Sequence, residues 1–312
     1  MTPFTPHLDD LKQRVVADGG FSPYPGGPSR ADATAWAIVT LAASNVGSDL
    51  LEPARTRLAQ DQHADGLVCV GPDHPKASWP TSLAILAWQD SPAHSDPHAR
   101  AIRYALGTSG KHWQNMLEGM IGHDTALQGW PWISDTHSWV EPTALATTAL
   151  RIAGYREHPR VAEAVRMLLD RQLPHGGWNC GNTYVFGKEL RPDPESTGAA
   201  LHALSGLVSP EQVQGSLSYL RTEVRRSRTP IALGWGLLGL GSWEPLPKEA
   251  AVWIAESLTR QKLYGPYDTS SLALVLLPLW APMGLIQMQR HARAAGGLPH
   301  SYVSTGSHLL DG

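Results

Sequence analysis

Four acidic residues stand within two positions of a threonine that begins an Ala/Leu-rich run. The four segments read Asp32-Ala-Thr34, Glu141-Pro-Thr143, Glu195-Ser-Thr197 and Asp268-Thr269. Carboxylates that converge raise one another's pKa, and a carboxyl group held protonated beside an apolar space can donate a proton. Glu141 lies in the most apolar of the four settings, Ser-Trp-Val-Glu-Pro-Thr, so it is the predicted general acid. Its predicted electrostatic partners are Asp32, Glu195 and Asp268.

The same acids have a plainer interpretation. An acidic side chain in the first turn of a helix stabilises the helix dipole by about 0.3–1 kcal/mol, and this role involves no chemistry. The pattern alone leaves both interpretations open for each of the four acids.

Tryptophan is unusually frequent, with 12 residues against 3 phenylalanines. A buried indole N–H needs a hydrogen-bond partner, so this many tryptophans require a reason. One interpretation is that they pack the helices together. In the other, aromatic residues beside the glycine turns line a pocket, where a ring face stabilises a carbocation by about 2 kcal/mol. The substrate-binding residues predicted on that basis are Trp130, Trp132, Trp139, Trp178 and Tyr267, with the polar side chains of Asn179 and His137.

A repeat along the chain indicates which elements position these residues. Six times a threonine opens an Ala/Leu-rich run, usually after a glycine turn and an aromatic residue. Six units in 312 residues are about 50 residues each, the size of one helical hairpin with its connections. The run 143–153 is apolar almost all round, whereas 158–171 has apolar residues only at helical spacing. Buried and amphipathic helices therefore alternate, and each threonine stands where a helix N-cap is expected.

This alternation predicts an all-α fold, an (α/α)6 toroid of about six hairpins whose inner helices surround a central cavity. All inner helices then point the same way, so their N-termini and the acids meet at one mouth of the cavity. The chain 1–312 is predicted to be a single domain, with repeats in 12–280 and a C-terminal extension in 281–312. The segment 176–195 is six residues longer than its counterparts and is predicted to cover or rim the pocket.

Composition excludes several classes of protein. A net charge of −3 shows no electrostatic footprint for nucleic acid. Two cysteines, Cys69 and Cys180, make no disulfide framework, and the first residues lack the basic and apolar regions of a signal peptide. The apolar run 272–282 is too short to span a bilayer. We therefore expect a cytoplasmic protein with no nucleic-acid partner, no transmembrane segment and no cofactor, for which peripheral membrane contact stays open.

The glycine–aromatic turn followed by a Thr-Ala helix resembles the repeats of squalene–hopene cyclases, class II terpene cyclases and the β-subunits of protein prenyltransferases. The resemblance extends over residues 12–280 and implies the α/α toroid. In class II cyclases the proton donor is the middle aspartate of an Asp-x-Asp-Asp-Thr-Ala motif. Glu141 occupies that position here, and Trp139 and Pro142 replace the flanking aspartates. The implied function is proton-initiated cyclisation or isomerisation of an isoprenoid or other hydrophobic substrate.

Two other functions are compatible with the repeat. A toroid without the flanking aspartates could bind a hydrophobic ligand, or act as a scaffold, without catalysis. A metal-dependent transferase resembling the prenyltransferases would hold zinc with an Asp-x-Cys pair and a histidine, but Trp178-Asn179-Cys180 has no aspartate at that position. Cys180 with Asp135 and His137 is the zinc set that remains, and we predict no metal site.

Overall fold

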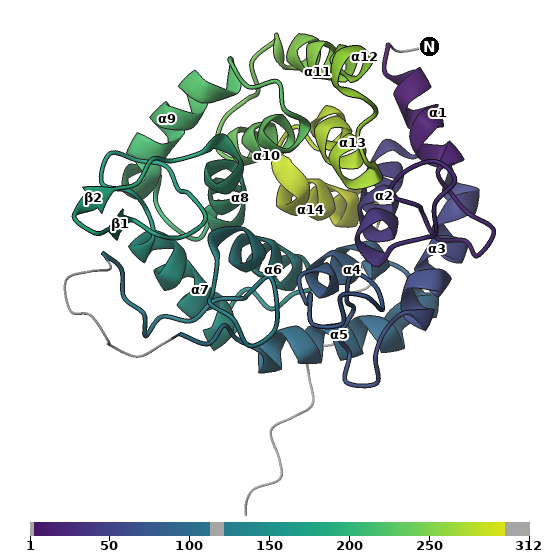
Figure 1. Ribbon diagram of the computed structural model, residues 1–312, viewed down its shortest axis with the longest axis horizontal. Coiled ribbons are helices and arrows are strands. Elements are labelled where there is room, and N and C mark those ends of the chain that lie inside the picture. Colours follow the sequence, from purple (N-terminus) through teal and green to yellow (C-terminus); the bar gives the residue numbers. More distant parts are fainter. Residues whose placement is uncertain (1–2, 113–121, 297–312) are drawn as a thin grey trace, which may run out of the picture.

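Six helices of the described chain stand side by side around a central space (Figure 1). The computed structural model describes residues 3–112 and 122–296. The inner ring consists, in order, of α2 (Ala31–Ser44), α4 (Pro80–Trp88), α6 (Val140–Ile152), α8 (Pro194–Leu204), α10 (Pro230–Gly241) and α13 (Thr269–Leu276). Consecutive inner helices are in contact, and α13 returns to α2, so the ring is closed. The predicted all-α toroid is confirmed.

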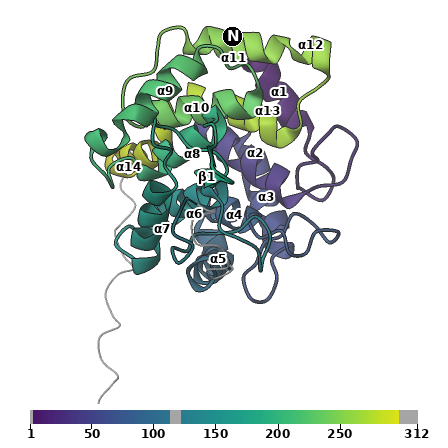
Figure 2. The same ribbon diagram turned by 60° about the vertical axis from the view of Figure 1, so that its left-hand side comes forward.

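A second layer of helices encloses the inner ring, as Figure 2 shows from another side. Every residue of α4 is buried, whereas the outer helix α7 buries only its inward face, as the amphipathic pattern predicts. Short 3-10 turns lie at Pro92–His94, Pro210–Val213 and Leu277–Leu279. The outer helices are α1 (Thr5–Gln13), α3 (Ser48–Gln60), α5 (Ser95–Gly107), α7 (Pro159–Asp170), α9 (Gln214–Val224), α11 (Ala250–Thr259) and the short α12 (Gln261–Tyr264).

The repeated threonines hold the glycine turns onto the inner helices. The Trp130 backbone N–H donates to Thr143 Oγ1 at 2.9 Å, and Thr143 Oγ1 donates to the Trp130 carbonyl oxygen at 3.4 Å. A Cβ atom at Gly129 would lie 2.1 Å from Thr143 Oγ1, which explains the glycine in this turn. The same exchange of hydrogen bonds joins Phe21 with Thr34, Val68 with Thr81, and Trp178 with Thr197.

This arrangement corrects the expectation that the threonines are N-caps. Thr143 is the fourth residue of α6, whose N-cap is Trp139. Thr229, the threonine that opens the fifth of the six Ala/Leu-rich runs, is the N-cap of α10, yet its side chain makes no capping hydrogen bond. The paired residues are 13 apart in three units and 19 apart in the fourth. The longer connection contains the antiparallel hairpin of β1 (Tyr184–Val185) and β2 (Lys188–Glu189).

Hydrogen bonds between the first and last units close the ring. Thr269 Oγ1 donates to the Ser22 carbonyl oxygen at 2.5 Å, across 247 residues of sequence. Thr40 Oγ1 donates to the Ala273 carbonyl oxygen at 3.0 Å, across 233 residues. The sixth inner helix is therefore attached to the first by the same residue type that organises the other units.

Glycines let α8 and α10 approach until their backbones touch. A Cβ atom at Gly198 would lie 2.3 Å from the Trp235 carbonyl oxygen. A Cβ atom at Gly239 would lie 2.4 Å from the Gly198 carbonyl oxygen. Neither helix has room for a side chain at this crossing, so larger residues there would force the ring apart.

The last described helix, α14 (Gly284–Gly296), lies inside the outline of the ring and contacts α6 and α10 (Figure 1). Its start is attached to α8, because the Leu285 N–H donates to His202 Nε2 at 3.0 Å. Burial, with the nearby charge of Arg151, lowers the pKa of His202 to about 3, so this imidazole is a neutral acceptor. The predicted C-terminal extension thus contains a helix of the core, and residues 297–312 lie outside the described chain.

No single helix in the described ranges is long and apolar enough to cross a membrane. The bent pair Thr269–Leu279 and Gly284–Arg290 meets the criteria of length and composition only when its two parts, at 59° to each other, are taken together.

Candidate active site at the amino-terminal rim

The first turns of α6 and α8 bring carboxyl groups together at one rim of the ring. Ser196 Oγ lies 2.9 Å from Asp193 Oδ2 and also hydrogen bonds with Glu141 Oε1. One hydroxyl group has one hydrogen to donate, so Ser196 can donate to only one of the two carboxyl groups at a time, and a proton on the other removes the repulsion between them. Glu141 Oε2 is buried and has no hydrogen-bond partner among the described residues. The cluster therefore has a place for a proton.

Burial and mutual repulsion favour the protonated form of this cluster. Burial raises the pKa of Glu141 against the opposing hydrogen bond from Ser196, and the charge of Asp193 adds to the rise. Burial, followed by the charges of Glu141 and Asp193, raises the pKa of Glu195 to about 7. The same two causes raise the pKa of the Cys180 thiol, which favours its neutral form. Glu141 and Glu195 thus have the raised pKa values expected of converging carboxyl groups.

The other two predicted acids lie elsewhere on the rim. Asp32 forms a salt bridge with Arg30, with two hydrogen bonds of 2.6 and 2.8 Å. Asp268 is the N-cap of α13 and accepts from the Ser271 N–H at 2.7 Å. Figure 1 shows α2 and α13 across the ring from α6 and α8. The predicted set of four acids therefore separates into two pairs, and Asp32 and Asp268 are not electrostatic partners of Glu141.

Two of the predicted pocket tryptophans are enclosed by protein. The Trp130 indole N–H donates to the Ala105 carbonyl oxygen of α5 at 2.8 Å, and the Arg160 guanidinium lies 4.4 Å from its ring centre. Trp178 is 0% exposed, and its indole N–H donates to the Leu168 carbonyl oxygen of α7 at 2.6 Å. Both rings join an inner turn to an outer helix, which is the packing interpretation of the tryptophans.

The remaining predicted binding residues are distributed along the rim. The Tyr267 hydroxyl donates to the Ser257 carbonyl oxygen at 2.6 Å, and the Trp132 ring packs edge-on against another tryptophan, 5.5 Å between centres. Asn179 Oδ1 accepts from two backbone N–H groups of its own loop, at 2.8 and 3.0 Å. Trp139 and His137 line a small cavity beside the start of α6. Of these residues, Trp139 lies nearest to Glu141 in the chain.

The described side chains form no metal site. No group of three His, Cys, Asp or Glu side chains within residues 3–112 and 122–296 is arranged to hold a metal ion. Cys180, Asp135 and His137 therefore do not come together as the zinc set that the sequence left open.

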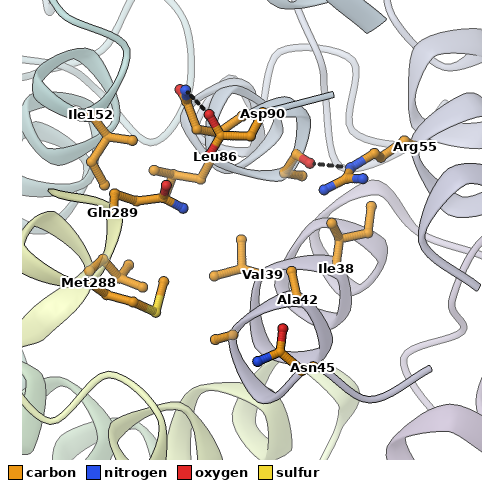
Figure 3. A pocket seen from close by; sticks show the side chains of 14 residues that line it. Ile38, Val39, Ala42, Asn45, Arg55, Leu86, Asp90, Ile152, Met288 and Gln289 are labelled. Carbon is orange, nitrogen blue, oxygen red and sulfur yellow. Dashed lines mark hydrogen bonds between the residues drawn. The ribbon is translucent and has the colours of Figure 1, made fainter. Parts of the chain in front are cut away.

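A cavity of about 300 Å³ lies at the opposite rim, where the inner helices end (Figure 3). Val39 of α2 and Met288 of α14 face each other across it, so α14 forms one of its walls. Ile152 also lines the cavity and is 11 residues after Glu141 on α6, which places the two about 16 Å apart along the helix. The sequence predicted a pocket at the rim that carries the acids. It did not predict this cavity, because one of its walls is α14, a segment outside the repeats. Its polar lining consists of Asn45, Arg55, Gln89, Asp90 and Gln289.

Comparison with known proteins finds similarity in structure alone. No family model and no curated protein matches the chain. A protein from Actinoplanes superposes with a TM-score of 0.58 at 17% identity, over 91% of this chain and 98% of its own. The type II terpene cyclase MstE from Scytonema superposes with a TM-score of 0.56 at 14% identity, over 91% of this chain and 97% of its own. A variant of the same cyclase, in complex with geranylgeranyl dihydroxybenzoate, superposes with a TM-score of 0.51 at 13% identity, over 92% of this chain and 99% of its own. The chain therefore has the terpenoid-cyclase-like α/α toroid fold.

Proposed function

We propose that this protein is a terpene-cyclase-like enzyme that protonates an isoprenoid or other hydrophobic substrate at the amino-terminal rim. The observation that supports the proposal most directly is Glu141 Oε2, a buried carboxyl oxygen without a partner among the described residues, in a group whose pKa is raised. A carboxylic acid in that setting presents its proton to whatever enters beside it. The shared fold adds support, since MstE structures hold a geranylgeranyl substrate and a product, merosterolic acid A.

The proposed reaction begins when a carbon–carbon double bond of the substrate takes the proton from Glu141. The substrate becomes a carbocation and Glu141 becomes a carboxylate, which the Ser196 hydroxyl stabilises by donating to it. The cation closes a ring or shifts its charge, then gives up a proton from another carbon to water, so the product is an isomer of the substrate. Glu195, with a pKa of about 7, returns a proton to Glu141 for the next cycle and takes up a proton from the solvent in its turn.

Deuterium incorporation tests this function. Purified protein is incubated in D2O with geranylgeranyl dihydroxybenzoate and simpler polyprenyl compounds, and products are analysed by mass spectrometry. We expect one deuterium in an isomerised product. Loss of a general acid costs about 10²- to 10⁴-fold in rate, so Glu141→Gln should reduce turnover by at least about 100-fold. The matched control is Glu157→Gln, on a side chain that is 91% exposed. Full turnover by Glu141→Gln would falsify the assignment of this residue as the acid.

A second function, binding of a hydrophobic ligand without catalysis, is favoured by the separation of the cavity from the acids. The cavity at the far rim is at the lower end of the about 300–1,000 Å³ found for small-molecule sites, and a ligand inside it lies about 16 Å from Glu141. Val39→Trp places an indole ring in this cavity and should weaken binding of a fluorescent prenyl probe there. The binding function replaces the enzymatic one if three results are found together: the probe binds to the wild type, Val39→Trp weakens that binding, and no substrate yields product.

A further inference from the structure

A second cavity, of about 180 Å³, lies beside the start of α6 and outside the carboxyl cluster. We call it the histidine pocket. It is smaller than the about 300–1,000 Å³ typical of sites for drug-sized ligands, so its size suits a small group. The pocket is lined by His112, His123, Thr125, His137, Ser138, Trp139, Arg171 and Asn182.

Arg171, at the end of α7, brings a buried positive charge to this pocket. Its side chain is 2% exposed. Nη1 donates to the Gly181 carbonyl oxygen at 2.7 Å, and Nε lies 3.6 Å from Asp170 Oδ2. Nη2 is buried and has no hydrogen-bond partner among the described residues. A buried charged donor without a partner is costly, so the guanidinium lacks an acceptor that a ligand could supply.

His112 and His123 of the pocket are neutral donors rather than charged groups. Burial, followed by the Arg171 charge, lowers the pKa of His112 to about 4 and that of His123 to about 3. His112 Nε2 accepts from the Ser138 N–H at 3.3 Å, so its proton is on Nδ1. His123 Nδ1 is buried and unpaired within the described chain, and the His137 ring lies 5.5 Å from that of His112. Asp124 and Asp170 are the acids that act on Arg171.

We infer that the histidine pocket binds a phosphate group. Arg171 makes the pocket unsuitable for a cation, and a guanidinium with free N–H groups matches phosphate oxygens. A carboxylate offers two oxygens to donors, whereas a phosphate monoester offers three, and the pocket has donors on Arg171, two histidines, Thr125 and Asn182. The ligand is accordingly inorganic phosphate or the phosphate end of a small organic molecule. This site is independent of the proposed function, because it uses none of the rim carboxyl groups.

Calorimetric titration of the full-length protein with inorganic phosphate, at constant ionic strength, tests the inference. We expect one phosphate per chain, with acetate binding at least about tenfold more weakly. Arg171→Met and His123→Phe should each weaken phosphate binding by at least about tenfold, equivalent to about 1.4 kcal/mol. The matched controls, Arg226→Met and His175→Ala, change side chains that are 76% and 89% exposed and should bind as the wild type does.

Arg171 also holds the Gly181 carbonyl, so Arg171→Met could fail to fold. In that case the exposed His137 gives the test, and His137→Ala should weaken phosphate binding several-fold in a protein with the wild-type circular dichroism spectrum. The inference is overturned if the folded wild type does not bind phosphate, if the pocket variants bind it as tightly as the controls, or if acetate binds equally well. Because the readout is binding, it is unaffected by whether Glu141 is an acid catalyst.

Discussion

Replacing Thr143 with valine tests whether the repeated threonine holds the inner turns in place. Valine has the shape of threonine but cannot accept the Trp130 N–H, whose bond to Thr143 Oγ1 measures 2.9 Å and is buried. A buried N–H left without an acceptor costs about 1–3 kcal/mol. The entropy of unfolding is about 2.1 cal/mol/K per residue, so for 312 residues each kcal/mol lowers the melting temperature by about 1.5 °C. We therefore expect Thr143→Val to melt about 2–5 °C below the wild type.

The same helix contains the matched control. Thr147, one turn further along α6, is 0% exposed, and its hydroxyl has no hydrogen-bond partner within the described residues. Thr147→Val removes an unpaired polar atom and should be neutral or stabilising. Circular dichroism melts and urea titrations of both variants at one pH measure the difference. The reasoning is refuted if Thr147→Val is as destabilising as Thr143→Val, or if Thr143→Val melts with the wild type.

Three further predictions concern the rim, the helix crossing and α14. The pKa of Glu195 is about 7 in the folded protein and near 4.3 in an unfolded chain, so the folded state binds the proton more tightly and stability falls as pH rises between these values. Glu195→Gln lacks this loss, so its free energy of unfolding at pH 8, measured by urea titration, should exceed that of the wild type by on the order of 1 kcal/mol, a figure reduced for the partial exposure of the side chain. If the stabilities of the two proteins change with pH in parallel, the prediction is contradicted. Gly198→Ala places a Cβ atom 2.3 Å from a carbonyl oxygen and should lower the melting temperature by several degrees, while Gly107→Ala, with nothing within 4 Å, should not. His202→Leu leaves the Leu285 N–H without its acceptor, so trypsin should cleave after Arg290 faster; an unchanged rate would show that α14 does not need this bond.

The fold was predictable because the Thr143–Trp130 type of contact recurs in four units, at 13 residues in three of them, and leaves a trace in the sequence. The hydrogen bonding of the threonines to the glycine turns was not predictable, because the spacing does not say where a helix begins. Asp193-Pro194 was an available signal, since an aspartate before a proline is typical of an N-cap followed by the first helical residue. Recognising it would have brought Asp193 into the carboxyl cluster.

The site was predictable only in part. The pairing of Glu141 with Glu195 follows from their equivalent places on neighbouring inner helices, α6 and α8. The neutralisation of Asp32 by Arg30 depends on a side-chain direction that no repeat encodes. The cavity at the far rim depends on α14, which belongs to no repeat, so periodicity could not reveal it.

The bonds that close the ring also bear on how the protein is made. Thr40 bonds with Ala273, and Ser22 with Thr269, so the first inner helix has one neighbour missing until almost the whole chain has left the ribosome. Contacts this distant in sequence form slowly. During synthesis the apolar side of α2 that α13 later covers is exposed, and we expect the nascent chain to engage a chaperone until the final hairpin arrives.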